Sequence, residues 1–289
     1  MKLGNQSGTA WTPLLRSRLM AGLQRVVGFD PTPFDPTFVE ATLERRRLAI
    51  ACESPRVYVE RVAGGDVAEA IALVESLQVH YTEFFRDPIA FALVERRVLP
   101  ELVRQRRKRG RELRVWSAGC GAGQEAYSVA ILLLELAGQN GHNVPFRVIA
   151  TDANETQLAN ARAGTFDVHA LRSLRVGQVE RWFVPQGTRH TIGAEVRAHV
   201  DFSSYDLLDD RSLGPPQGVF VSFDLVLCCN VLFYYRAKAQ RALLRKLTSA
   251  LVPGGYLVVG ETELDVVARE GRGFARLEPS TAVFRRGFV

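Results

Sequence analysis

The sequence predicts an α/β protein with a doubly wound parallel sheet, preceded by a small helical domain. Residues 1–95 place apolar side chains at helical spacing, whereas strand-like and helix-like segments alternate from Leu113 onward. A glycine-rich turn, "GCGAG" at 119–123, joins the first strand of that alternation to its first helix. Because 289 residues suffice for two domains, we place these at residues 1–95 and 96–289.

The helical domain is justified by two segments, "PTFVEATLERRRLAIAC" and "VAEAIALVESLQ". The alternation then reads "LRVWSAG" (strand), "AYSVAILLLELAG" (helix), "FRVIATD" (strand) and "NETQLANARAG" (helix). Later come a buried strand "FDLVLCCNVLFYY" at 223–235, a helix "KAQRALLRKLTSALVPGG" ending in Pro-Gly-Gly, and a strand "YLVVG". Residues 165–202 break the alternation with short strands around glycine turns, which predicts an inserted antiparallel β-subdomain.

The composition is that of a globular protein. Hydrophobic residues make up 47% and charged residues 24%, as in ordinary globular proteins. No apolar run is long enough to span a bilayer, and the start "MKLGNQSGTAWTP" lacks the apolar core of a signal peptide. We therefore expect a cytoplasmic protein that is not inserted in a membrane. The four cysteines (52, 120, 228 and 229) lack metal-ligand spacing, so we predict reduced thiols and no metal site.

The net charge of +6 comes from 37 basic and 31 acidic residues. The basic residues concentrate in "RQRRKRGR" at 104–111 and in "ERRRL" at 44–48. This charge fits an acidic partner surface or nucleic acid, and for 104–111 it also fits a solvated helix end.

The glycine turn indicates a ligand site. Gly119, Gly121 and Gly123 allow a tight turn with amides exposed at a strand end, which serves a dinucleotide, a nucleoside or a turn alone. Asp152 ends the second strand, where a carboxylate can accept both hydroxyl groups of a ribose. Glu125 would repel a diphosphate but suits an ammonium group. This pattern favours S-adenosylmethionine over NAD.

Five motifs in order resemble the CheR-type methyltransferases, which methylate glutamate side chains of bacterial chemotaxis receptors. They are "HYTEFFRDP" (80–88), "RVWSAGCGAGQEAYSVAILL" (114–133), "ATDANETQLANARAGTF" (150–166), "CCNVLFYY" (228–235) and "LVPGGYLVVGETE" (251–263). The resemblance covers roughly residues 40–285. It implies a Rossmann-like S-adenosylmethionine-dependent methyltransferase sheet, an N-terminal helical domain and a β-subdomain inserted at about 165–202. The implied product of the cofactor is S-adenosylhomocysteine.

The resemblance also implies roles for single residues. Arg86 and Tyr234 are the expected catalytic residues. The expected cofactor contacts, which include the glycine turn, are His80, Thr82, Arg86, Gly119, Gly121, Gly123, Glu125, Asp152, Asp206, Leu207, Cys229 and Asn230. Three positions depart from the family pattern: His80 and Asp206 stand where asparagine is usual, and Cys229 stands where the family has arginine.

The resemblance and the site residues predict a protein-glutamate O-methyltransferase. Its predicted partner is the acidic helical region of a methyl-accepting chemotaxis receptor or similar signalling protein, and not nucleic acid. A glutamate side chain is already ionised near neutral pH, so alignment with the methyl group matters more than a strong base. One alternative is a methyltransferase for another protein or a small molecule. Another is an inactive receptor-binding or cofactor-sensing homologue, and a dehydrogenase ranks third.

Overall fold

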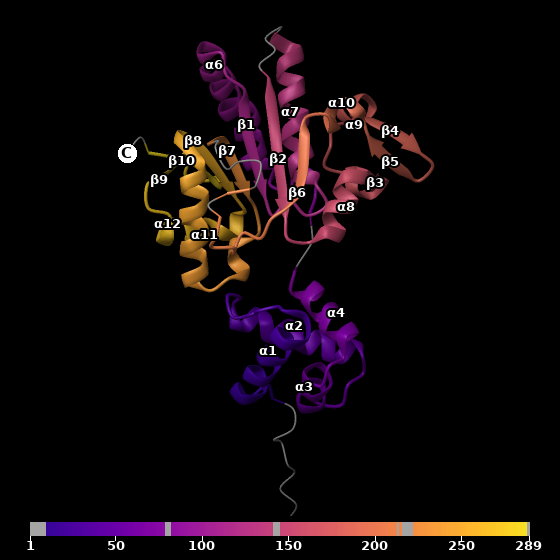
Figure 1. Ribbon diagram of the computed structural model, residues 1–289. Helices are drawn as coiled ribbons and strands as arrows, with labels where there is room; N and C mark the ends of the chain where they lie inside the picture. Colours follow the sequence, from indigo (N-terminus) through magenta and orange to yellow (C-terminus); the bar gives the residue numbers. More distant parts are fainter. Residues whose placement is uncertain (1–9, 79–81, 141–144, 213, 216–221, 288–289) are drawn as a thin grey trace, which may run out of the picture. The chain divides into compact units, whose positions relative to one another are not determined.

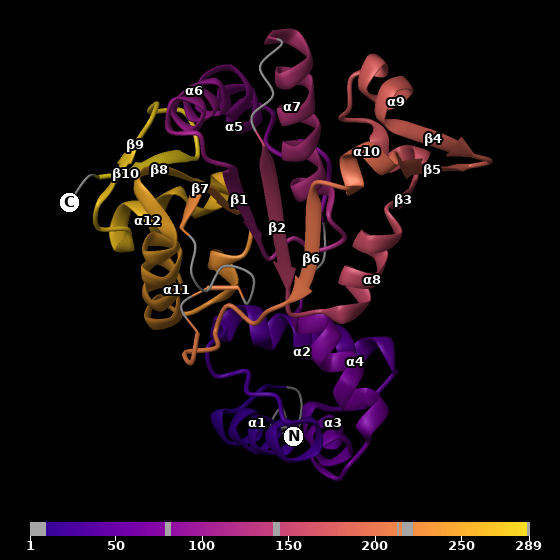
Figure 2. The ribbon, with the colours of Figure 1, turned by 45° about the horizontal axis from the view of Figure 1, so that its top comes forward.

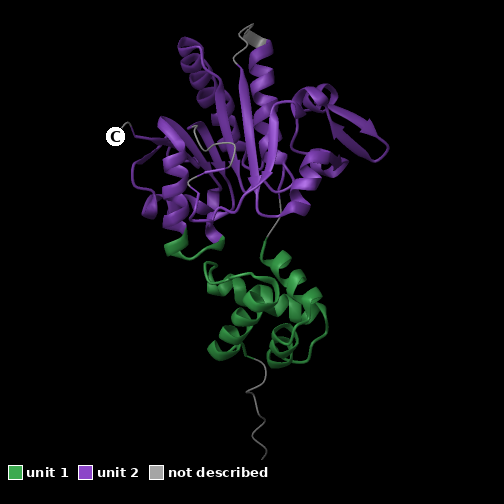
Figure 3. Cartoon of the chain, viewed as in Figure 1, with its two compact units in different colours: residues 1–79, 234–239 green, residues 80–233, 240–289 purple. Residues whose placement is uncertain are grey.

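The structure is a computed structural model that describes residues 10–78, 82–140, 145–212, 214–215 and 222–287. The chain divides into two compact units, shown in different colours in Figure 3. The first contains residues 1–79 and 234–239, and the second contains residues 80–233 and 240–289. The domain limit after residue 95 stays a prediction.

Among its described residues, the first unit contains four complete helices: α1 (Pro13–Val27), α2 (Pro36–Ala49), α3 (Pro55–Ala63) and α4 (Val67–Leu77). Each begins after a residue whose side-chain oxygen accepts a hydrogen bond from a first-turn amide: Thr12, Asp35, Ser54 and Asp66. Three of them also have proline at the start, where the missing N–H costs nothing. The helical reading of the N-terminal region is therefore confirmed.

A late segment of the chain completes this first unit. The amide of Asp35 donates to the carbonyl of Tyr234 at 2.8 Å, and Phe34 and Tyr235 form an antiparallel bridge. The rings of Phe34 and Tyr235 lie 4.9 Å apart, and those of Phe38 and Tyr234 lie 4.8 Å apart. Residues 234–239 thus belong to the helical unit although they follow a strand of the second unit.

In the basic segment at 44–48, Arg46 and Arg47 form ion pairs within the first unit. Arg46 donates from Nε and Nη2 to the two carboxylate oxygens of Glu69, at 3.0 and 2.6 Å, and Tyr58 donates its hydroxyl to the same carboxylate at 2.7 Å. Arg47 pairs with Glu44 in the same two-pronged way. The pair between Arg46 and Glu69 therefore joins α2 to α4, since a bidentate pair fixes both partners, whereas Arg47 and Glu44 both lie on α2.

The second unit is built on a seven-stranded sheet with the order β6-β2-β1-β7-β8-β10-β9 (Figure 1). Its strands are β1 (Leu113–Ala118), β2 (Phe146–Asp152), β6 (Val200–Ser204), β7 (Phe223–Cys228), β8 (Leu251–Val259), β9 (Phe274–Arg276) and β10 (Val283–Arg286). The five strands from β6 to β8 are parallel, and β10 is antiparallel to both of its neighbours. This is the mixed α/β fold with a mostly parallel sheet that the alternation predicts.

The remaining helices are α5 (Pro88–Leu93), α6 (Leu99–Arg109), α7 (Gln124–Asn140), α8 (Glu155–Ala163), α9 (Val176–Trp182), α10 (Ala194–Arg197), α11 (Ala237–Ala250) and α12 (Leu264–Glu270). A π-helical turn, Val94–Val98, joins α5 to α6. Short 3₁₀ turns cover Val168–Leu171, Leu232–Tyr234 and Glu261–Glu263. Among the described residues, no helix combines the length and apolar character that crossing a bilayer requires.

Two predicted boundaries are wrong. The strand over 223–235 ends at Cys228, because Asn230 takes the left-handed conformation with φ of 60° and a 3₁₀ turn follows. The helix predicted to run through Pro-Gly-Gly ends at Ala250, and β8 includes that tripeptide. The register shift between β7 and β8 after Phe223 accommodates the extra residues.

The predicted β-subdomain is a separate three-stranded antiparallel sheet. Its strands are β3 (Thr165–Asp167), β4 (Phe183–Gln186) and β5 (Arg189–Ile192), in the order β3-β5-β4. Figure 2 shows this sheet beside α8 and α9, apart from the seven-stranded sheet. The insertion ends before β6, which pairs with β2 in the main sheet.

Candidate functional site

The glycine turn is fixed by hydrogen bonds to the end of β2. The amides of Gly119 and Cys120 donate to the carbonyl of Thr151, at 2.8 and 2.9 Å, and the amide of Gly121 donates to Oδ2 of Asp152 at 2.9 Å. The three glycines have φ angles of 78°, 53° and 90°, which residues with a side chain rarely adopt. Glycine is therefore required by the backbone of this turn.

Close packing imposes the same requirement. A Cβ atom on Gly119 would stand 2.7 Å from Cγ2 of Val231, and one on Gly123 would stand 3.0 Å from Cβ of Ala161 and Cζ of Phe202. The turn is consequently wedged between the segment after β7 and the elements α8 and β6. A side chain at Gly119 or Gly123 would displace the turn from the strand ends.

The parallel strands bring most of the predicted site residues to one edge of the sheet. The neighbours β6, β2, β1 and β7 all run in the same direction, so their carboxyl ends meet at that edge. The strand order reverses between β1 and β7, and ligands of open α/β sheets bind at such a switch point. The residues at or shortly after these strand ends are 119–125, 152, 206–207 and 229–230.

Glu125 lies in the first turn of α7 and is partly exposed. Ser117 donates its hydroxyl to Oε1 of Glu125 at 2.6 Å, and the Cys229 thiol, whose acceptor is the carbonyl of Val258 at 3.8 Å, lies close enough to favour the charged form of the carboxylate. Loss of hydration raises the pKa of Glu125 to about 7, although these two side chains and the positive charge of Arg86 oppose the rise. The carboxylate is thus a poorly compensated negative charge, suited to a cationic ligand group.

Asp152 ends β2 and offers its carboxylate beside the glycine turn. Oδ1 accepts from the amide of Asn154 and Oδ2 from the amide of Gly121, both at 2.9 Å. Each carboxylate oxygen has a second lone pair, and the residue is partly exposed. The two amides hold the carboxylate in one orientation, which suits recognition of two neighbouring hydroxyl groups.

The segment before α5 reaches the glycine turn from another direction. Cγ2 of Thr82 would lie 3.3 Å from a Cβ on Gly121, and the Thr82 carbonyl accepts a hydrogen bond from Nε2 of Gln124 at 3.4 Å. Arg86 is exposed and interacts electrostatically with Glu125. His80 lies outside the described residues.

Asp206 and Leu207 follow β6. Asp206 is exposed, and its Oδ1 accepts from the amide of Leu208 at 2.8 Å, which forms a tight turn. Leu207 is buried, and its carbonyl accepts from Nζ of Lys246 at 2.7 Å. The carbonyl of Asp209 accepts from the same ammonium group at 2.6 Å, so the lysine anchors this loop.

The remaining predicted residues lie in the segment after β7 and belong to different units. Cys229 and Asn230 are partly exposed and lie in the second unit, where the Cys229 thiol donates to the carbonyl of Val258 at 3.8 Å. Tyr234 belongs to the first unit, where its ring packs on Phe38. Its catalytic role stays a prediction.

Three residues of the site were not predicted from the sequence. Ser117 is fully buried beneath Glu125, and Glu263 is fully buried behind the segment after β7. Gln124 is buried, and its Oε1 has no hydrogen-bond partner among the described residues. A buried acceptor without a donor is costly, which is consistent with a ligand that supplies one. Only the position of Gln124, directly after the third glycine, offers a sequence signal.

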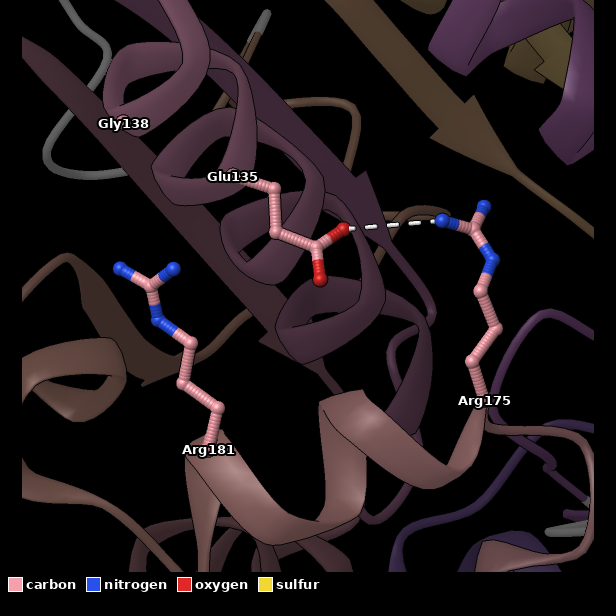
Figure 4. Close-up of a pocket in the computed structure, with 4 residues that line it drawn as sticks. All are labelled: Glu135, Gly138, Arg175 and Arg181. Atoms are coloured by element: carbon pink, nitrogen blue, oxygen red, sulfur yellow. Dashed lines mark ion pairs between the residues drawn. The ribbon is translucent and has the colours of Figure 1, made fainter.

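A separate hollow of about 380 Å³ lies between α7 and α9, lined by Glu135, Gly138, Arg175 and Arg181 (Figure 4). Glu135 lies ten positions after Glu125 on α7, roughly 15 Å along the helix axis. Its carboxylate accepts from Gln178 at 3.0 Å and pairs with Arg175 at 3.9 Å. The hollow contains none of the predicted site residues.

Comparison with known protein families identifies the fold and the cofactor. The family model described as "CheR methyltransferase, SAM binding domain" matches residues 80–275, which include β1 to β8 and all of the strand ends described above. The chain belongs to the CheR methyltransferase family. Its cofactor is accordingly S-adenosylmethionine, as the glycine turn, Glu125 and Asp152 predict.

Two relatives are about one-third identical to this chain over the residues that align. The chemotaxis protein methyltransferase Cher2 of Pseudomonas putida is 35% identical over 196 residues, which cover 66% of this chain and 68% of that protein. An uncharacterized 104.1 kDa protein of Rhodobacter capsulatus is 34% identical over 230 residues, covering 80% of this chain but only 23% of that protein. The solved structure of TrmN from Thermus thermophilus aligns with a TM-score of 0.36 and 18% identity, over 68% of this chain and 52% of that one.

The first prediction concerns Asp152 and the cofactor of this CheR-type chain. Replacing Asp152 by alanine removes the acceptor for a ribose diol and should weaken binding of S-adenosylmethionine by about 1–3 kcal/mol. Isothermal calorimetry measures this loss, with Asp201→Ala as control, because Asp201 is an exposed aspartate in mid-strand on β6. Equal affinity of the Asp152 variant and the unaltered protein would remove Asp152 from the binding site.

Proposed function

We propose that this CheR-type methyltransferase esterifies glutamate side chains of a chemotaxis-receptor-like signalling protein. The observation that carries the proposal is the pair of carboxylates, Glu125 and Asp152, oriented on either side of a glycine turn at the switch point of the sheet. The relatives whose names identify them as chemotaxis protein methyltransferases support the choice of substrate class.

The residues present fit the cofactor. Glu125 is suited to the methionine ammonium group, Asp152 to the ribose hydroxyls, and the unpartnered Oε1 of Gln124 to a donor on the ligand. Leu207 contributes apolar surface next to the loop after β6. When bound, S-adenosylmethionine supplies an electrophilic methyl group on its sulfonium.

Arg86 is the residue we assign to the acceptor. It is exposed, yet its charge acts on the carboxylate of Glu125, so it stands between solvent and the cofactor residues. A guanidinium group can hold a carboxylate by two parallel hydrogen bonds and thereby fix the direction of its oxygen. Because a glutamate is ionised at neutral pH, orienting it is the main task left to the protein.

We propose an acidic helical region of the receptor as the partner surface of this chain. The candidate cations lie on α6, which leads into the start of β1, so they would attract the partner at the end of the strands opposite the glycine turn. The arginines at 46 and 47 are engaged in internal pairs, whereas no ion pair within the described chain involves Arg104, Arg107, Lys108 or Arg109, which are exposed on α6. These cations supply an attraction for acidic helices that salt should weaken.

The proposed product gives the second prediction. Membrane and soluble fractions incubated with the protein and methyl-labelled S-adenosylmethionine should contain labelled protein whose label is released as methanol by mild alkali. Esters of carboxylates hydrolyse under conditions that leave N-methyl groups intact. Label that resists alkali would move the acceptor to nitrogen, and labelling of a small molecule alone would refute a protein substrate. Absence of any label with a bound cofactor would favour the inactive receptor-binding alternative.

A further inference from the structure

A buried carboxylate, that of Glu263, accepts most of the main-chain hydrogen bonds described below for the segment after β7 that carries Cys229 and Asn230. Glu263, in the 3₁₀ turn after β8, has no exposed surface. Its Oε2 accepts from the amides of Asn230 at 2.8 Å and Gly260 at 2.7 Å. Its Oε1 accepts from the amides of Leu232 at 2.5 Å and Phe233 at 3.4 Å. All four bonds are made to main-chain donors, three of which lie in the segment 230–233.

This pattern explains how an irregular segment stays in one conformation. The amides of residues 230, 232 and 233 have left the ladder of β7, so burial without acceptors would be costly. Burial raises the pKa of Glu263, whereas the four amides oppose that rise and favour the ionised form. Gln240 holds the other side of the segment, since its Nε2 donates to the carbonyl of Leu232 at 3.2 Å.

The same carboxylate controls the position of the Asn230 side chain. Asn230 has φ of 60°, a conformation that asparagine tolerates and that the amide bond to Glu263 maintains. Gly260, also bonded to Glu263, gives the room for this side chain, because a Cβ on Gly260 would stand 2.7 Å from Nδ2 of Asn230. The φ of Gly260 is −72°, so its own backbone conformation permits a larger residue, and the obstacle is Asn230, whose main-chain nitrogen would also lie 3.0 Å from that Cβ.

We propose that Glu263 is a positioning residue for methyl transfer, which fixes the segment 229–233 so that Asn230 and Cys229 face the cofactor. The inference rests on the proposed function for the roles of Asn230 and Cys229. It adds a specific cause for their placement: a buried carboxylate that neutralises main-chain donors and does not touch the substrate. A residue that acts through the segment in this way should affect cofactor affinity and turnover together.

Glu263→Gln tests the inference while preserving the shape of the side chain. The amide nitrogen would face two main-chain donors, so two of the four bonds are lost and the segment shifts. We expect S-adenosylhomocysteine, measured by calorimetry, to bind at least about tenfold more weakly and turnover to fall by a similar factor or more. Glu261→Gln is the matched control, because Glu261 is exposed in the same 3₁₀ turn, and it should bind as the unaltered protein does.

A second variant keeps the test decisive if Glu263→Gln fails to fold. Gly260→Ala leaves Glu263 intact but displaces the side chain of Asn230, so the same loss of S-adenosylhomocysteine affinity is expected. Folded variants, verified by near-UV circular dichroism, that bind with unchanged affinity would overturn the inference, even if their melting temperature is lower. Calorimetry needs no methyl acceptor. Loss of affinity in the variants, together with failure of the unaltered protein to esterify any glutamate, would therefore refute the proposed function and leave the role of Glu263 in cofactor binding standing.

Discussion

Arg86→Ala is expected to lower kcat by about 100-fold at saturating cofactor and substrate, because misalignment of a reacting group is felt in the transition state. Arg86 is exposed, so its removal should leave the fold close to that of the unaltered protein, and saturating S-adenosylmethionine keeps any lost cofactor contact of Arg86 from limiting kcat. Initial rates with labelled cofactor and a receptor fragment measure the effect. Arg86→Lys, which keeps the charge but loses the two-pronged guanidinium, should recover only part of the rate.

The control for this result is Arg96→Ala, which removes another exposed arginine from the π-helical turn before α6. Its kcat should be unchanged. A raised Michaelis constant for the receptor with normal kcat in Arg86→Ala would assign Arg86 to docking and not to alignment. Full turnover in a folded Arg86→Ala protein would exclude the residue from the site altogether.

Glu125→Gln should make the cofactor-free protein more stable at pH 8 while weakening its affinity for S-adenosylmethionine. Desolvation raises the pKa of Glu125 to about 7, above the ordinary value of 4.5 in an unfolded chain. The folded state therefore binds a proton that the unfolded state releases between these two values. The contribution of Glu125 to stability is complete below pH 4.5, falls as the pH rises, and is lost above about pH 7.

Glutamine does not titrate, so the stability difference between the variant and the unaltered protein should grow with pH. We expect the variant to gain about 1–3 kcal/mol relative to the unaltered protein between pH 4.5 and pH 8. Urea unfolding at several pH values in the absence of cofactor measures this gain. A difference that does not change with pH would show that the pKa of Glu125 is ordinary.

The affinity for cofactor should follow the same titration. An ammonium group binds the ionised carboxylate, so the dissociation constant of S-adenosylmethionine should rise about tenfold per pH unit below pH 7. In Glu125→Gln this slope should vanish and the affinity at pH 8 should be lower. A slope that persists in the variant would assign the titration to another group.

The site residues at the carboxyl ends of the strands can be predicted from the sequence, because they lie at or shortly after recognisable strands. Asp152 and the glycine turn come directly after apolar runs, so their convergence follows from the parallel order of the strands. Glu125 is recognisable because it falls in the first turn of the helix after the glycines. Such residues are identified by their place relative to a local pattern.

Glu263 shows why other parts of the site cannot be predicted in this way. Three of its four partners are main-chain amides about 30 positions earlier, and main-chain donors leave no trace in the identity of side chains. The end of β7 at Cys228 differs from the prediction for a related reason. The apolar run continues from Val231 to Tyr235, and only the tertiary contacts of that segment decide that it leaves the strand.

The exchange of residues 234–239 into the helical unit has a consequence for how the chain folds. Nε of Arg236 donates to the carbonyl of Phe34 at 2.9 Å, across a separation of 202 positions. On a ribosome, the helices of the first unit emerge long before the segment that completes them. The nascent helical unit must therefore wait, with Phe34 and Phe38 lacking their aromatic partners, until most of the sheet has been synthesised. A fragment ending at residue 79 would retain this deficit permanently, so the intact chain is the unit in which these helices reach their final stability.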